Sequence, residues 1–156
     1  MTFTLLLVGK TTDLHIQALI DDYCKRLSHY VAFSIRIVPE LRNAKSLTEE
    51  QQKEAEGRLL LAQVDRSDCL FLLDEHGREF RSVEFADYVQ RLMSAGRNVV
   101  FAVGGPYGFS KAVYDRADGK LSLSKLTFSH QMVRLFFVEQ FYRAMTILRH
   151  EPYHHE

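Results

Sequence analysis

Three stretches of the chain carry residue types that could hold a small ligand. Leu72-Leu73-Asp74 is an apolar run that ends in a carboxylate, with Gly77 close behind it. Gly104-Gly105-Pro106-Tyr107-Gly108 sets two adjacent glycines, which allow close approach to the backbone, beside a proline that stiffens the turn. Leu123 to Phe128 mixes polar and apolar residues. A glycine-rich turn also has a purely conformational explanation, so the motif alone does not decide between a ligand site and a tight turn.

The spacing of these residues excludes several common sites. The chain contains no G-x-G-x-x-G, G-x-x-x-x-G-K-[ST] or G-x-S-x-G motif, the fingerprints of dinucleotide folds, P-loops and serine hydrolases. His150 and His154 are four residues apart, but Pro152 between them prevents a shared helical face, so we expect no metal site. Cys24 and Cys69 lie in apolar segments, which indicates buried thiols and neither a disulfide nor a zinc site.

The chain ends in a tail with two further candidates for chemistry, Tyr153 and His154. Chain ends of this length are usually frayed. A histidine with an ordinary pKa of about 6.5 and a stacking aromatic ring would be useful in a site only if the tail is ordered. From the residues alone both possibilities stay open.

The apolar pattern predicts the elements that would position these stretches. Phe3 to Val8 is a continuous apolar run typical of a strand covered on both faces. Asp13 is the expected N-cap of the first helix, and Ser46-Leu-Thr-Glu49 fits the capping box of the second. We expect strands at 3–8, 33–38, 69–73, 99–103 and 121–127, and helices at 13–29, 46–64, 82–96, 110–117 and 130–149. This alternation predicts an α/β fold with a mainly parallel sheet and helices on both faces.

Composition places the chain among ordinary globular proteins. With 156 residues and 46% apolar side chains, we expect one domain over 1–156. The 20 basic and 20 acidic residues argue against a protein that coats nucleic acid by bulk charge. Residues 1–96 carry 12 basic and 15 acidic side chains, against 8 and 5 in residues 97–156, so an anionic partner should meet the second part. The start of the chain shows no signal peptide or membrane span, which predicts a cytoplasmic protein.

Five elements of the chain, in this order, match one family. They are Leu72 to Arg78, Val103 to Gly108, Leu123 to Arg134, Glu139 to Ala144 and Pro152 to His154. Together they resemble the RlmH family of SPOUT-class methyltransferases, which act on a pseudouridine of large-subunit ribosomal RNA. The likeness covers essentially the whole chain and is strongest after residue 70.

This resemblance implies a SPOUT methyltransferase fold whose C-terminal part forms a deep trefoil knot, although general folding rules disfavour knots. It also implies a homodimer and the cofactor S-adenosylmethionine. The residues that would hold the cofactor are Leu73, Gly104, Gly105, Leu123, Ser124, Lys125, Leu126, Thr127 and Phe128. Apolar side chains among them would sandwich the adenine, while backbone groups near the glycines and Ser124 would bind its edge and the ribose.

The implied reaction is methylation of N3 of pseudouridine 1915 in helix 69 of 23S rRNA, within the assembled ribosome. A nearly neutral protein suits this substrate, because a large preformed ribosomal surface can contribute binding. The enzyme must hold N3 in line with the methyl carbon at about 3 Å, and N3 must lose its proton.

The resemblance and the residue chemistry together give the candidates for the substrate side of the site. We expect His130, Arg134 and Arg143 to hold the base edge or flanking phosphates. His154 would accept the proton or hold a water that does, and Tyr153 would stack on the base. Each has a structural alternative: the arginines could pair with acids along the last helix, and His130 could donate to backbone at its helix start.

Two other functions stay open from the residues alone. A ribosome-associated factor without a cofactor could keep the fold, but it would not need an intact glycine turn and the segment Leu123 to Phe128. A flavodoxin-like nucleotide or signalling domain fits the alternation of strands and helices, but it lacks phosphate-binding loops and leaves Tyr153 and His154 unexplained. Binding of S-adenosylmethionine separates the methyltransferase from both.

Overall fold

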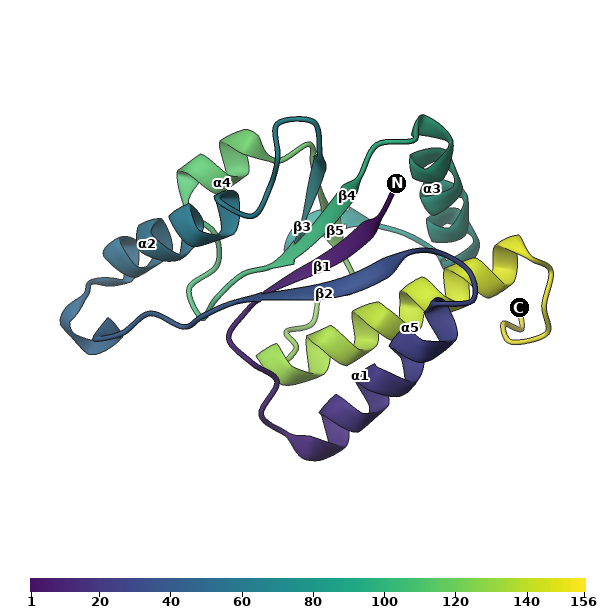
Figure 1. Ribbon diagram of the computed structural model, residues 1–156, viewed down its shortest axis with the longest axis horizontal. Helices are drawn as coiled ribbons and strands as arrows, with labels where there is room; N and C mark the ends of the chain where they lie inside the picture. The colour runs from purple at the N-terminus through teal and green to yellow at the C-terminus, as the bar shows by residue number, and fades with distance from the viewer.

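The strands form one five-stranded sheet in the order β2-β1-β4-β3-β5, and every neighbouring pair is parallel (Figure 1). The computed structural model describes residues 1–156. The strands are β1 (Phe3–Val8), β2 (Phe33–Val38), β3 (Cys69–Glu79), β4 (Val99–Val103) and β5 (Gly119–Ser122). The predicted α/β fold with a parallel sheet is therefore confirmed, while the trefoil knot stays a prediction.

Helices cover both faces of the sheet, as the sequence pattern predicts (Figure 1). The helices are α1 (Leu14–Leu27), α2 (Glu49–Leu61), α3 (Ser82–Ala95), α4 (Lys111–Arg116) and α5 (His130–Leu148), with a short 3-10 helix η1 (Ala44–Ser46) before α2. Leu5 and Leu7 of β1 pack in the core with α1, α3 and α5, and Leu6 between them packs in the core with α2 and α4. Because successive strand residues point to opposite faces, a strand buried on both faces needs an unbroken apolar run.

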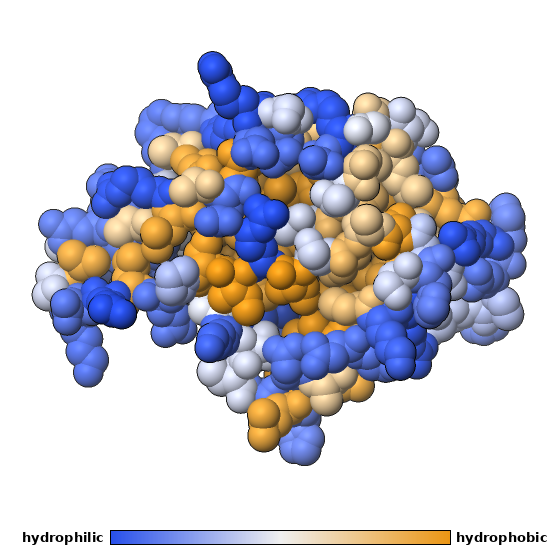
Figure 2. All heavy atoms as spheres, viewed as in Figure 1, coloured by the Kyte–Doolittle hydropathy of each residue, from blue (hydrophilic) through white to orange (hydrophobic).

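The surface in Figure 2 is mostly polar, with apolar residues gathered along the middle of this face, where Figure 1 shows β2. β2 is an edge strand, and its Ile37 is an exposed large apolar side chain. None of the helices combines the length and apolar character needed to cross a membrane.

The local helix signals are partly confirmed. Asp13 caps α1, because its carboxylate accepts hydrogen bonds from the backbone N–H groups of His15 and Ile16. The capping box predicted at Ser46 is wrong by two residues: Thr48 is the N-cap of α2, and Gln51 completes the box. The Ser46 hydroxyl instead donates to the carbonyl of Asn43 at 2.8 Å within η1. The motif of Ser46 and Glu49 overlaps with that of Thr48 and Gln51, and Thr48 has the extended backbone that an N-cap residue adopts.

The largest difference from the predicted elements concerns β3 and β5. β3 does not end at Leu73 but continues to Glu79, with an irregularity between Leu73 and Arg78 where the pairing to β5 shifts. β5 begins at Gly119 and ends at Ser122, so the segment Leu123 to Phe128 is a loop. A Cβ on Gly77 would lie 2.7 Å from the backbone nitrogen of Leu121, so only glycine lets the two strands approach this closely.

Both cysteines are free, as predicted. Cys69 is buried, while Cys24 is only half-buried. Burial, with a smaller contribution from Asp21, raises the pKa of the Cys24 thiol to about 11. Cys24 is therefore a thiol at neutral pH and a weak nucleophile.

Candidate active site

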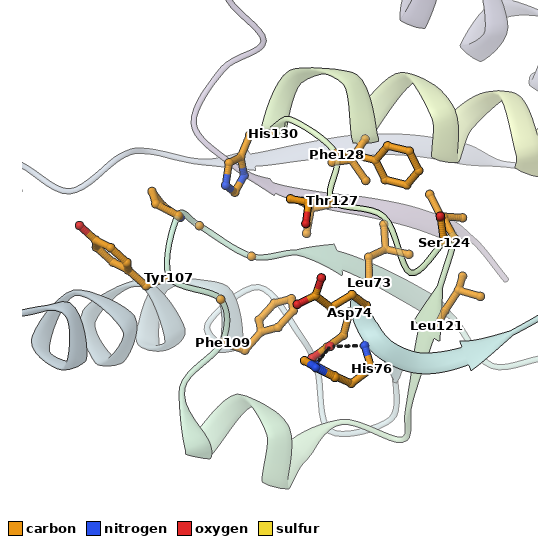
Figure 3. Close-up of a pocket in the computed structure, with 18 of the residues that line it drawn as sticks. Leu73, Asp74, His76, Tyr107, Phe109, Leu121, Ser124, Thr127, Phe128 and His130 are labelled. Atoms are coloured by element: carbon orange, nitrogen blue, oxygen red, sulfur yellow. Dashed lines mark hydrogen bonds and ion pairs between the residues drawn. The ribbon is translucent and has the colours of Figure 1, made fainter.

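A pocket of about 470 Å³ opens at the carboxyl ends of β3, β4 and β5 (Figure 3). The three stretches singled out in the sequence meet there, since the lining comes from 73–76, 103–109 and most of 121–128, together with Tyr114 of α4 and His130 and Val133 of α5. Its volume lies in the range of pockets for small molecules, and the carboxyl ends of parallel strands are the usual place for one. Of the residues predicted to hold a cofactor, all but Lys125 line this pocket. Lys125 is exposed and lies 3.9 Å from the carboxylate of Glu79.

The loop between β5 and α5 is shaped by serine hydroxyls. Ser122 Oγ donates to the carbonyl of Ser124 at 2.9 Å, and Ser124 Oγ accepts from the backbone N–H of Leu126 at 3.0 Å. Ser129 then caps α5 by accepting from the N–H of Met132. These bonds fold the segment so that Ser124 and Thr127 lie on the pocket wall (Figure 3).

The glycine turn packs against Glu56, a buried acidic residue of α2. A Cβ on Gly105 would come within 2.5 Å of both carboxyl oxygens of Glu56, which projects from α2 and is 4% exposed. Burial, followed by the charge of Glu40, raises the pKa of Glu56, although Gln52 opposes the shift. Gly108 closes the turn at a φ of +84°, with its N–H donating to the carbonyl of Gly105. Gly105 is therefore required by close approach and Gly108 by backbone conformation.

Asp74 is a pocket residue to which the sequence analysis assigned no role. One carboxyl oxygen accepts from the His76 backbone N–H at 2.8 Å, and the other accepts from the Tyr114 hydroxyl of α4. Figure 3 shows the Asp74–His76 contact at the pocket wall. A carboxylate just after an apolar strand was the available signal, since the ends of parallel strands carry ligand-binding residues.

The charged residues of the pocket lining are mainly acidic. Its lining includes Asp74, Glu75 and two histidines, His76 and His130, but no lysine or arginine. Burial and the neighbouring Arg134 lower the pKa of His130, which favours its neutral form at pH 7. A pocket of this kind disfavours phosphate groups and favours a cation.

A second cluster of polar groups lies at the far end of α5, where the C-terminal tail folds back (Figure 1). Arg143 donates to Glu139 Oε1 at 2.7 Å, and the Tyr153 hydroxyl donates to the same oxygen at 2.8 Å. The Arg143 guanidinium lies 4.8 Å from the Tyr153 ring centre, and its Nη1 lies 3.1 Å from Nδ1 of His154. These contacts tie the tail to α5, so of the two possibilities that the sequence left open, the structure shows the ordered tail.

The contact with Arg143 decides which nitrogen of His154 carries the proton. Arginine has only donors, so Nδ1 of His154 must accept and the proton sits on Nε2. That Nε2 is buried and has no hydrogen-bond partner, and Oε1 of Glu156 lies 3.6 Å from it. Burial is the main reason that the pKa of Tyr153 is raised, with help from Tyr23 and Glu139, so its hydroxyl stays a donor.

Comparison with known proteins agrees with this arrangement. A family model described as "Predicted SPOUT methyltransferase" matches residues 1–154. The chain belongs to the SPOUT methyltransferase family. It is 55% identical to a protein of Phocaeicola vulgatus and 54% identical to one of Flavobacterium johnsoniae, each over 100% of both chains. A protein of Bacteroides fragilis is also 54% identical over the full length of both chains. All three are named "Ribosomal RNA large subunit methyltransferase H", so the resemblance drawn from the motifs is confirmed.

In this SPOUT methyltransferase the predicted substrate-side residues fall into separate places. His130 lines the pocket, whereas Arg143, Tyr153 and His154 form the cluster at the other end of α5. The rise of an α-helix puts about 20 Å between His130 and Arg143 along α5. One chain therefore does not bring its own tail to its own pocket.

Arg134 has a third location. It is 3% exposed and donates to the carbonyls of Val8 and Gly9 and to the hydroxyl of Thr11. It does not line the pocket, and it forms no ion pair with an acid of the last helix, so neither of the two predicted roles matches its contacts. It holds the turn between β1 and α1 against α5.

We predict that Arg134→Met lowers stability more than it changes affinity for the cofactor. The change leaves the buried carbonyl of Gly9 without a donor, and an unpaired buried group costs about 1–3 kcal/mol. Urea unfolding measures the shift, with Arg149→Met, an exposed arginine at the end of the same helix, as the control. An unchanged unfolding midpoint together with lost methylation would show that Arg134 acts on the substrate.

Proposed function

We propose that this chain uses S-adenosylmethionine to methylate N3 of pseudouridine 1915 in helix 69 of 23S rRNA, within the assembled ribosome. The observation that carries the proposal is the pocket at the ends of β3, β4 and β5, which has an apolar wall, a glycine turn and acidic groups but no lysine or arginine. Three full-length relatives carry a name that specifies methylation of large-subunit ribosomal RNA.

The pocket residues fit this cofactor. S-adenosylmethionine is a nucleoside without phosphate that bears a positive sulfonium, which matches a pocket without lysine or arginine. Leu73, Leu123 and Leu126 supply the apolar wall for an adenine ring, and Gly104 and Gly105 also line the pocket. When bound, the cofactor supplies an electrophilic methyl group.

We propose that the active protein is a homodimer in which the tail of one chain serves the pocket of its partner. The support is the separation of pocket and tail along α5, since Tyr153 and His154 have no access to the pocket of their own chain. A two-fold dimer would repeat the arrangement symmetrically and build two equal sites.

In this dimer the tail and α5 act on the base. Arg143 would hold the base edge or a flanking phosphate, His130 would contact the base from the pocket side, and Tyr153 would stack. Because Nδ1 of His154 is engaged with Arg143 and Nε2 carries the proton, His154 would hold a water that receives the N3 proton and would not take that proton directly. The other requirement of the reaction is that the site holds N3 in line with the methyl carbon.

Mass mapping of large-subunit RNA from cells with and without this protein tests reaction and position together. We expect a single methyl group on the pseudouridine of helix 69 to disappear when the protein is removed and to return when it is restored. The same modified base in cells that lack the protein would contradict the proposal. Calorimetry with S-adenosylmethionine adds a test of the two alternatives, since no binding at high micromolar cofactor would favour a cofactor-free factor or a flavodoxin-like domain.

A further inference from the structure

The Asp74 carboxylate is nearly buried in the wall of a pocket that has no lysine or arginine. We propose that Asp74 recognises the positive charge of the methyl donor and thereby distinguishes it from neutral nucleosides; this rests on the proposed use of S-adenosylmethionine. Asp74 is then a specificity-determining residue of the cofactor site, separate from the apolar and glycine contacts that receive the adenine and ribose.

The geometry holds the carboxylate in place and leaves room for another donor. Oδ1 accepts from the His76 N–H and lies 3.3 Å from His76 Nδ1, while Oδ2 accepts from the Tyr114 hydroxyl. An ionised carboxylate has about four acceptor positions, so it can take a further contact from a ligand. The side chain of Asp74 is 9% exposed and lines the pocket.

No fixed cation of the protein balances this carboxylate. Its only ionisable basic neighbour is His76, whose side chain is 79% exposed and carries a charge only when protonated. No lysine or arginine lines the pocket. The negative charge of Asp74 therefore has no lysine or arginine partner, and it can attract a ligand that brings positive charge.

The protonation states agree with this role. Burial by itself would raise the pKa of Asp74, but the hydrogen bonds from Tyr114 and His76 outweigh burial and hold the pKa below its ordinary value. Burial and the contact with Asp74 raise the pKa of Tyr114 to about 12, so Tyr114 remains a donor. At neutral pH the pocket therefore presents a negative charge.

A purely structural role for Asp74 is the competing explanation, because its bonds also tie the irregular part of β3 to α4. The two explanations differ in one measurable respect. A structural role affects every ligand of the pocket alike, whereas recognition of charge affects only charged ligands.

Asp74→Asn tests the proposal, since it removes the charge with little change of shape. The amide oxygen can still accept from the His76 N–H, while the amide nitrogen would donate to the Tyr114 hydroxyl oxygen. Calorimetry measures binding of three nucleosides. S-adenosylmethionine has a sulfonium, an ammonium and a carboxylate, S-adenosylhomocysteine has the ammonium and the carboxylate, and 5′-methylthioadenosine has none of these charges. We expect S-adenosylmethionine to bind about 10- to 100-fold more weakly, as for loss of a charge-assisted contact, and 5′-methylthioadenosine to bind as before. S-adenosylhomocysteine should lose no more than S-adenosylmethionine does.

The matched control is Asp87→Asn, the same substitution at an exposed aspartate of α3 that does not line the pocket, and it should change no affinity appreciably. Tyr114→Phe keeps the charge of Asp74 but removes one hydrogen bond that holds it. It should weaken binding less than Asp74→Asn does, with the largest loss again for S-adenosylmethionine and the smallest for 5′-methylthioadenosine. If Asp74→Asn does not fold, this ranking of the three ligands tests the proposal. Equal losses for all three nucleosides, or no loss, would overturn the proposal. A wild-type protein that binds none of them would instead contradict the proposed function, and the role of Asp74 with it.

Discussion

Gly105→Ala is expected to weaken binding of S-adenosylmethionine by about 10- to 100-fold, because overpacking a filled site costs about 1–3 kcal/mol. The added Cβ would lie 2.4 Å from one carboxyl oxygen of Glu56 and 2.5 Å from the other. Glu56 is buried and has little room to withdraw, so the turn itself must move out of the position that lines the pocket. Calorimetry of the purified variant measures the effect.

Two controls separate this clash from general damage. Gly96→Ala also replaces a glycine, at a φ of +73° and with nothing within 4 Å of the new Cβ, so it should lower stability slightly and leave the affinity for cofactor unchanged. Combining Gly105→Ala with Glu56→Ala removes the obstacle and should restore part of the affinity. Full affinity in Gly105→Ala alone would mean that the cofactor does not lie against this turn.

Removal of residues 153–156 is expected to reduce the rate of ribosome methylation by more than about 100-fold and to leave the affinity for S-adenosylmethionine unchanged. A factor of about 100 is the lower limit of what acid–base groups usually contribute to a rate. The reason is the separation between the two sites: the tail binds α1 and α5 through Tyr23, Glu139 and Arg143, and none of these residues lines the pocket. Single-turnover transfer of a radioactive methyl group to ribosomes that lack the modification measures the rate.

Single substitutions test which residue of the tail is responsible for the effect of the truncation. His155→Ala serves as the control, since His155 is exposed and has no assigned role. His154→Gln should lower the rate without changing cofactor binding, because it cannot present the same N–H beside Arg143. Unchanged turnover in the truncated protein would show that the tail is idle and would remove the main support for a shared site in the dimer.

Local signals predicted the fold well where a single motif acted alone. The apolar run at Phe3 to Val8, the cap at Asp13 and the short helix after Ser110 all appear as predicted, because each depends on neighbours within a few residues. The prediction failed at Ser46, where two capping motifs overlap, and at the end of β3, where Asp74 to Gly77 has the composition of a turn. There the partner strand β5, distant in sequence, keeps the chain extended.

The sequence by itself determined the order of strands and helices, the parallel sheet, the family and the three stretches that line the pocket, because these follow from short-range periodicity and from motifs at fixed spacing. Only the tertiary structure decided that Arg134 binds backbone, that Tyr114 holds Asp74, and that Tyr153 and His154 lie away from the pocket of their own chain. Each of these depends on contacts between side chains far apart in sequence. Such contacts are set by how helices pack on the sheet, and no local pattern encodes them.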